Sequence, residues 1–145
     1  MAYHVMLVGD DYITNLIDSA IFENLEQVSQ VSSFTNPSQA LQYLRSRCVP
    51  GIDTHPLEPL PDLLLVDLKM VPIDGFDFLT ELKHCCGEAF YKICIAVLTC
   101  SLHPRDHRLA SELQVATYLA KPLTEPKARQ LLAVSNAMRS RLPYP

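Results

Sequence analysis

Side chains that can do chemistry stand directly after the apolar segments of this sequence. Asp10 and Asp11 follow the first apolar run, and Asp67 ends a later one. Thr99 ends another run, and Lys121 follows the last. In open α/β sheets, ligands bind outside the carboxyl ends of the strands. If these runs are parallel strands of one sheet, three carboxylates, one hydroxyl and one ammonium group converge at one edge.

Three neighbouring carboxylates repel one another, so their ionised state favours a bound cation. The candidate ligands are all oxygen atoms, which suits Mg²⁺ better than zinc. A carboxylate beside such a metal can attack a phosphoryl group while the metal and a lysine balance the charge on the transferring oxygens. Asp67 is the best candidate for this nucleophile, and Thr99 is placed to hydrogen-bond the bound phosphoryl group.

The elements that must position these groups alternate along the chain. Short apolar runs are typical of buried strands, and each is followed by apolar residues at helical spacing. Five strands alternating with five helices predict a doubly wound α/β sheet. The strands are expected over residues 3–9, 28–34, 63–67, 93–99 and 115–119. The first helical pattern starts at Ile13, and the later helices are expected to begin at Asn36, Asp74, His103 and Thr124, the last running to about Arg141.

Length and composition indicate one domain. The chain has 145 residues, is 48% apolar and 19% charged, and carries a formal charge of −4. That length is enough to bury a full core without staples. Lysine and arginine occur singly, which argues against nucleic acid as a partner. No run is long enough to span a bilayer and no export signal is visible, so a cytoplasmic protein is expected. The proline-rich segment 48–61 is interpreted as a surface loop.

The cysteines and histidines give no sign of a metal site. The five cysteines lack Cys-x-x-Cys spacing, so reduced thiols are expected. The run His84–Cys86 is interpreted as polar and packing residues near a helix end, because adjacent cysteines cannot easily face one zinc ion. The remaining histidines are interpreted as surface or loop residues without partners; they include His4, His55, His103 and His107.

The ordered set of motifs resembles the receiver domain of response regulators in bacterial two-component signalling, of the CheY-like stand-alone kind. The resemblance covers roughly residues 3 to 141 and implies a flavodoxin-like (βα)5 sandwich with strand order 2-1-3-4-5. Each motif alone is weak, whereas the ordered set is highly specific. The motifs are Asp10-Asp11, Asp67-Leu68-Lys69-Met70 leading to Asp74-Gly75, Thr99, and Tyr118 three residues before Lys121-Pro122.

The resemblance implies a Mg²⁺ site and a phosphorylation site. Asp11, Asp67 and the backbone carbonyl of Lys69 would ligate the metal, and Asp10 would assist through a water molecule. Asp67 would accept a phosphoryl group from a phosphohistidine on a sensor histidine kinase or a phosphotransfer protein. Lys121 would pair first with Asp67 and later with a phosphoryl oxygen.

The resemblance also implies a switch. Thr99 would shift toward the phosphoryl group and Tyr118 would follow it inward, which would remodel the surface of the fourth helix, fifth strand and fifth helix. The bond before Pro122 would be cis. Output would then be binding, to an unidentified target protein or as a homodimer. Beyond the last helix only residues 142–145 remain, so no output domain is expected.

Some positions depart from the family pattern or are expected to tune it. Gly9 stands where relatives often carry a branched or acidic residue. Val71 separates Met70 from Pro72, so the loop carrying the Lys69 carbonyl is expected to bend differently. Three side chains are expected to influence how fast water reaches the phosphoryl group, namely Lys69, Cys100 and Ser101.

Other interpretations remain open. Asp10 could simply cap the first helix, since Asp is a favoured cap, and Tyr118 could pack on the sheet edge with its hydroxyl in water. A pseudo-receiver would bind partners without phosphorylation, although such modules commonly lose an acid that this chain keeps. A small Mg²⁺-dependent phosphohydrolase would need a second acid at position 69, where Lys69 stands. The chain is therefore not expected to be an enzyme beyond its own phosphorylation and dephosphorylation.

Overall fold

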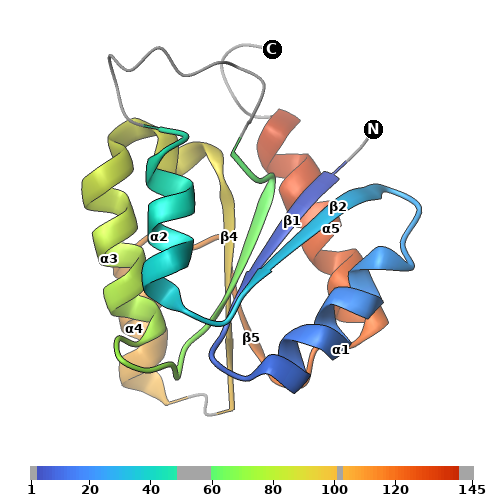
Figure 1. Ribbon diagram of the computed structural model, residues 1–145, viewed down its shortest axis with the longest axis horizontal. Helices are drawn as coiled ribbons and strands as arrows, with labels where there is room; N and C mark the ends of the chain where they lie inside the picture. The colour runs from blue at the N-terminus through green and yellow to red at the C-terminus, as the bar shows by residue number, and fades with distance from the viewer. Residues whose placement is uncertain (1–2, 49–59, 101–102, 141–145) are drawn as a thin grey trace.

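The computed structural model describes residues 3–48, 60–100 and 103–140, which form a parallel sheet between two layers of helices (Figure 1). The strand order β2-β1-β3-β4-β5 confirms the expected doubly wound class. The strands are β1 (Tyr3–Val8), β2 (Val28–Phe34), β3 (Leu63–Asp67), β4 (Cys94–Thr99) and β5 (Thr117–Ala120). The helices are α1 (Tyr12–Glu23), α2 (Pro37–Arg45), α3 (Gly75–Cys86), the 3₁₀ helix η1 (Gly87–Lys92), α4 (Pro104–Glu112) and α5 (Glu125–Ser140).

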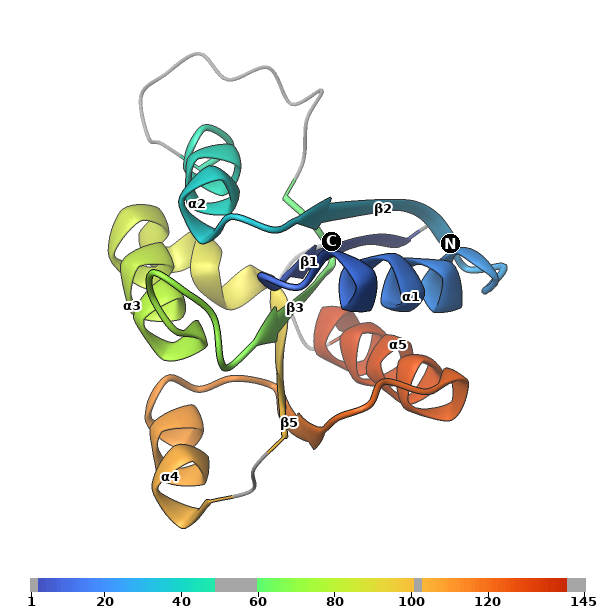
Figure 2. The ribbon, with the colours of Figure 1, turned by 60° about the horizontal axis from the view of Figure 1, so that its bottom comes forward.

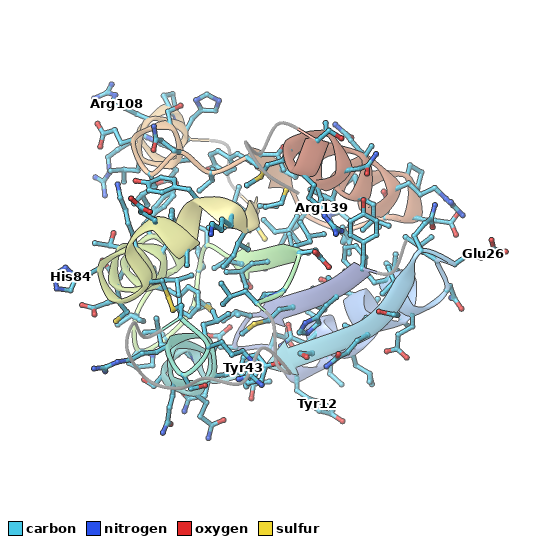
Figure 3. All side chains as sticks on the ribbon, turned by 90° about the horizontal axis from the view of Figure 1, so that it is seen from above. Tyr12, Glu26, Tyr43, His84, Arg108 and Arg139 are labelled. Atoms are coloured by element: carbon cyan, nitrogen blue, oxygen red, sulfur yellow. A yellow bond between two sulfur atoms is a disulfide. The ribbon has the colours of Figure 1, made fainter. Side chains whose placement is uncertain are left out.

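Helices cover both faces of the sheet, and the central strands are therefore apolar throughout. Figure 2 shows α1 and α5 on one face and α2, α3 and α4 on the other. Within β1, Met6 and Val8 pack toward α2 and α3, while Val5 and Leu7 pack toward α1 and α5. Because a strand buried on both faces has no polar side, these runs are continuous rather than alternating. Figure 3 shows side chains filling both layers.

Side chains at the expected positions cap the N-termini of α2, α3 and α4. The side chains of Asn36, Asp74 and His103 each accept a backbone N–H at the start of α2, α3 and α4, respectively. Such caps satisfy donors that the first turn leaves without a partner. The cap of α1 is Asp11, which accepts from the backbone of Ile13 and Thr14. The interpretation of Asp10 as this cap is wrong.

The apolar stripe of α1 faces solvent, which its helical spacing did not predict. Ile13, Leu16 and Ile17 are all more than half exposed. The face turned toward the protein instead carries Asn15, Asp18, Ser19 and Phe22. A 3.6-residue period identifies a helix but does not say which side is buried when both faces carry apolar residues.

Several boundaries differ from the predicted ones, mostly by one residue. The fifth strand begins at Thr117, two residues later than expected, and the segment after α3 forms η1. Gly87 separates α3 from η1 with a φ of 57°, a conformation that glycine adopts readily. Residues 49–59, Ser101, Leu102 and residues 141–145 lie outside the described residues, and so does most of the proline-rich segment.

The expectation that all cysteines are reduced is wrong. Cys48 and Cys86 form a disulfide between the ends of α2 and α3, with Cα atoms 5.4 Å apart and a sequence separation of 38 residues. Spacing alone could not reveal this pair, because only the packing of α2 on α3 brings the two residues together. Cys85, Cys94 and Cys100 have free thiols.

An ion pair lies at the end of β3 opposite Asp67. There Nη1 of Arg139 on α5, labelled in Figure 3, lies 3.2 Å from Oδ1 of Asp62. Within the described ranges, no helix has both the length and the apolar character needed to cross a membrane.

Candidate functional site

The sheet register brings the predicted side chains to one edge. β1 and β3 are neighbours, and Val8 lies beside Val66. Asp10 and Asp11 lie shortly after Val8, beyond the end of β1, and Asp67 directly follows Val66. On the next two strands, Thr99 pairs with Ala120, the residue before Lys121. The predicted convergence is therefore present.

The closest contact of the site joins Lys121 and Asp67. The Nζ atom of Lys121 lies 2.7 Å from Oδ2 of Asp67, and the two side chains are only 22% and 11% exposed. The other carboxylate oxygen, Oδ1, accepts the backbone N–H of Lys69 at 3.2 Å. A charge-assisted hydrogen bond in a partly buried position fixes the orientation of both groups.

Several bonds hold Lys121 in place. Its backbone N–H donates to the carbonyl of Thr99 at 2.8 Å, and the Lys121–Pro122 bond is cis, as the resemblance implies. Lys127 donates from Nζ to the carbonyls of Ala120 and Pro122, at 2.7 and 2.9 Å. No sequence motif singles out Lys127, whose partners are backbone atoms on both sides of Lys121.

The carboxylates of Asp10 and Asp11 each accept hydrogen bonds from backbone N–H groups. Asp11 caps α1, and these hydrogen bonds, chiefly that from Thr14, lower the pKa of Asp11. Asp10 accepts the backbone N–H of Val71 at 3.2 Å and so joins the loop after β1 to the loop after β3. Both carboxylates are exposed at the rim of the site.

The loop from β3 to α3 needs glycine at position 75. A Cβ atom there would lie 2.8 Å from the carbonyl oxygen of Asp67 and 2.9 Å from Cα of Leu68. Gly75 also donates its N–H to the carbonyl of Leu68 at 2.7 Å. The inserted Val71 precedes a second cis bond, Val71–Pro72, which the sequence analysis did not predict.

Gly9 also makes a close approach. A Cβ atom there would lie 3.0 Å from Oδ1 of Asn15 and 3.2 Å from Cβ of Asp67. The Asn15 amide uses this space to donate to the carbonyls of Gly9 and Phe34, at 2.8 and 3.1 Å. The departure at Gly9 is thus matched by a buried asparagine that ties α1 to β1 and β2.

Thr99 and Tyr118 are connected to α4 through a histidine. Thr99 is fully buried, and its side chain hydrogen-bonds Tyr118, so the interpretation of the Tyr118 hydroxyl as free in water is wrong. Burial, the largest cause, raises the pKa of Tyr118, while this bond opposes the rise. The Tyr118 ring stacks on His107 of α4 with centroids 5.7 Å apart. His107 was interpreted as having no partner, and that interpretation is also wrong.

Two other histidines among the described residues have partners as well. His103 caps α4, and Nε2 of His4 lies 2.9 Å from Oγ of Ser32. His55 lies outside the described residues. Each partner belongs to the local backbone or a neighbouring strand, so neither histidine is linked to the acidic site.

Sequence reasoning missed an acid beneath the site. Asp18 of α1 is only 8% exposed and lines a small cavity of about 10 Å³ together with Asp67, Lys121, Thr14 and Asn15. Burial raises the pKa of Asp18 to about 6, a rise that Lys121 opposes and Asp67 reinforces. A cavity of this size holds about one water molecule. No motif marks Asp18, because it stands within the helix rather than at a strand end.

The carboxylates suit a magnesium ion in donor chemistry. Among the described residues, no three acids, histidines or cysteines are gathered as a ready-made metal cluster. Mg²⁺ keeps several water ligands and is held by one or two carboxylates, so such a cluster is not required. Asp11, Asp67 and the Lys69 carbonyl are the oxygen donors that the resemblance implies at this edge. The set fits a weakly held, hard cation.

Exposed apolar side chains lie on the two segments that follow the acidic strand ends, helix α1 and the β3–α3 loop. Tyr12, Ile13, Leu16 and Ile17 of α1 and Val71 of the β3–α3 loop are each 55% to 70% exposed. We call these five residues the apolar rim. Five exposed large apolar side chains around one site are more than scattered surface residues require, and such patches mark interaction sites.

Two of the three expected rate-tuning positions lie in the described chain. Lys69 and Cys100 are both exposed. Lys69 lies two residues after Asp67, and Cys100 directly follows Thr99. Ser101 lies outside the described residues. Both described side chains are accessible from solvent, as a position that influences attacking water must be.

Comparisons with known proteins agree with this geometry. A family model described as "Response regulator receiver domain" matches residues 5–133. The probable methanogenesis regulatory protein FilR2 of Methanothrix harundinacea is 30% identical over 120 residues, which are 83% of this chain and 72% of that protein. A two-component response regulator from Cytophaga hutchinsonii is 25% identical with a TM-score of 0.77, covering 92% of this chain and 96% of that one. The Mn(2+)-bound form of response regulator Rcp1, at 20% identity and a TM-score of 0.69, covers 99% of both chains.

Proposed function

The chain belongs to the response regulator receiver domain family, and on this premise we propose that it is a switch phosphorylated on Asp67. The phosphoryl group comes from a histidine kinase or a phosphotransfer protein in a Mg²⁺-dependent reaction. The phosphorylated form signals through the surface of α4, β5 and α5, which we call the output face.

The pairing of Lys121 with Asp67 is the observation that carries this proposal. A buried carboxylate could be a structural ion pair, but this one ends a strand beside two exposed acids. Lys121 engages Oδ2 of Asp67, while Oδ1 accepts the backbone N–H of Lys69. An acceptor needs a fixed carboxylate with a cation beside it.

Each residue of the site has its own role in phosphoryl transfer. Asp67 attacks the phosphorus atom, the bond from the donor histidine nitrogen breaks, and the phosphoryl group becomes an acyl phosphate. Lys121 neutralises charge on the transferring oxygens, and the Thr99 hydroxyl is placed to hydrogen-bond one of them. Bound Mg²⁺, held by Asp11, Asp67 and the Lys69 carbonyl with Asp10 acting through water, supplies charge neutralisation. A Mn²⁺-bound response regulator is among the similar folds.

The apolar rim gives the phosphodonor protein its contact surface. It flanks the acceptor on two sides, from α1 and from the loop after β3. Transfer between two proteins requires the donor histidine to be held close to Asp67, and burial of apolar area supplies that binding energy. A small donor such as acetyl phosphate needs no such surface.

The output face is connected to the site through Thr99. A phosphoryl group that binds the Thr99 hydroxyl competes with the Tyr118 hydroxyl, which shares the same partner. Tyr118 lies on β5 and stacks on α4, so its rearrangement changes the output face. Helix α4 buries only Ala110 fully, which makes it the helix of this face least anchored to the core.

Intact mass after incubation with acetyl phosphate and Mg²⁺ tests the proposal. The wild-type protein is expected to gain one phosphoryl group, whereas Asp67→Asn and a chelator-treated sample are expected to gain none. Asp62→Asn is the matched control, because it changes an acid at the other end of the same strand. A folded wild-type protein with no adduct under trapping conditions would favour a binding module that is not phosphorylated.

A further inference from the structure

A fourth carboxylate lies beneath the three acids of the site. Asp18 projects from the inward face of α1, next to Asn15 and Ser19, and is only 8% exposed. It lines the same water-sized cavity as Asp67 and Lys121. The floor of that cavity is apolar and is formed by the strand residues Leu7, Leu65 and Leu98.

A buried carboxylate in such a place needs a counter-charge. Removing an ionised carboxyl group from water is costly unless a cation or hydrogen-bond donors compensate. In the part of the chain that the structure describes, Asp18 makes no hydrogen bond and no ion pair within 4 Å. The one cation that acts on it is Lys121, whose attraction stabilises the charged form. Lys121 is therefore the compensating group.

We propose that Lys121 is shared by two carboxylates, with Asp67 as its direct partner and Asp18 as its partner across the water-sized cavity. A water molecule in that cavity bridges the Asp18 carboxylate and the ammonium group. Asp18 is thus a positioning residue, which acts on the site through Lys121 and does not touch the phosphoryl group.

The second partner matters when Asp67 is engaged elsewhere. A cation held by the acidic site would neutralise part of the charge on the Asp67 carboxylate before phosphorylation. The attraction that holds Lys121 at 2.7 Å then weakens. Asp18 keeps a negative charge on the inner side of the ammonium group with and without that cation, so Lys121 stays at the site. Only this consequence rests on the proposed function, because the pairing itself belongs to the unmodified protein.

The reactivity of the Lys121 amine measures the pairing without any phosphorylation. A lysine whose Nζ atom is held between carboxylates acylates slowly, because it must leave those partners before it can reach an activated ester. The protein is treated with an N-hydroxysuccinimide acetate ester, and acetylation of Lys121 is followed by peptide mass spectrometry. Four proteins are compared: wild type, Asp18→Asn, Asp67→Asn and the double variant. Lys83 on α3 serves as an internal reference for the reagent.

Sharing predicts a non-additive pattern. Each single variant is expected to raise the Lys121 labelling rate by no more than about threefold, and the double variant by about thirtyfold or more, well beyond the roughly ninefold product of two independent effects. A double variant that labels no faster than Asp67→Asn alone would overturn the proposal. Asp62→Asn is expected to leave the rate unchanged. Asp18→Ser, a second neutral variant, must reproduce Asp18→Asn, and circular dichroism confirms that every variant is folded.

The adduct measurement separates this inference from the proposed function. Loss of the phosphoryl adduct with the labelling pattern intact would contradict only the proposed function. A normal adduct on Asp67 with additive labelling rates would contradict only the sharing of Lys121. The two experiments use the same four proteins, so each result can be assigned to one of the two statements.

Discussion

Lys121 and Asp67 are 54 residues apart in sequence and 2.7 Å apart in the structure. Two neighbouring strand pairs bring them together, since β3 pairs with β4 and β4 pairs with β5. The hydrogen bond from the Lys121 backbone to Thr99 adds the third member of the site. The acceptor, the cation and the switch hydroxyl are thus coupled through the order of the strands.

Replacing Lys121 separates phosphorylation from its consequences. Lys121→Ala is expected to be phosphorylated by acetyl phosphate more slowly, by about tenfold or more, because one lost charge contact is worth about 1 to 3 kcal/mol. The amide resonances of α4 and β5 are expected to stay unchanged on phosphorylation. Lys83→Ala, a lysine on α3, is the control. A normal α4 response in Lys121→Ala would show that the lysine does not transmit the signal.

The buried acid gives the fold a pH dependence. Burial raises the pKa of Asp18 from 3.8 to about 6, so the native state holds this proton up to a higher pH than the unfolded chain does. The resulting stability is fully present below about pH 4 and is lost as the pH rises through 6. At pH 7, Asp18→Asn is therefore expected to be more stable than wild type by about 2 kcal/mol. Urea unfolding from pH 4 to 8 measures this difference, and an unchanged difference across that range would contradict it.

The aromatic stack links α4 to the switch. His107→Ala is expected to leave the phosphoryl adduct on Asp67 intact while reducing the response of α4 amides to phosphorylation. His107→Phe keeps a ring over Tyr118 and is expected to restore that response. Arg108→Ala changes an exposed residue of α4 that neighbours His107 in sequence and is the comparison. Equal behaviour of the Ala and Phe variants would mean that the stack does not couple the two elements.

The disulfide is expected to stabilise the fold without affecting the site. It joins α2 and α3 at their last turns, away from the strand ends that carry the acids. Closing a chain segment of this length is worth on the order of 3 to 4 kcal/mol. Cys48→Ser is therefore expected to lower the melting temperature and to accept the phosphoryl group at the wild-type rate. A variant that loses phosphorylation while still folded would place the bridge in the functional machinery.

Charge on the apolar rim distinguishes a protein donor from a small one. Ile17→Asp is expected to slow transfer from a phosphohistidine protein by about tenfold or more, because a charge prevents burial of that contact. Phosphorylation by acetyl phosphate is expected to be unchanged. Tyr91→Asp on η1, exposed but outside the rim, is the matched control. A rim variant that slows both donors equally would indicate a damaged site instead.

The sequence predicted the elements and the main site because the apolar runs mark the strands and the site residues stand at the ends of those runs. Asp67, Thr99 and Lys121 each end or follow an apolar run, so a parallel sheet places them at one edge without further information. Helix caps such as Asn36 are equally local. These features depend on neighbouring residues, and the structure confirms them.

The features that the sequence did not reveal depend on contacts between elements. Asp18 is polar on the inner face of a helix whose outer face is apolar, so periodicity pointed the wrong way. His107 finds its partner only because α4 packs beside β5. The Cys48–Cys86 bridge likewise follows from the packing of two helices. Each requires the tertiary structure to be known first.

Chemical trapping of the acyl phosphate tests the central claim most directly. Borohydride reduces an aspartyl phosphate to homoserine, which peptide mass spectrometry then locates in the sequence. After incubation with acetyl phosphate and Mg²⁺, homoserine is expected at position 67 and at no other aspartate. Homoserine at Asp10 or Asp11, or its formation in Asp67→Asn, would show that the phosphoryl acceptor is a different residue.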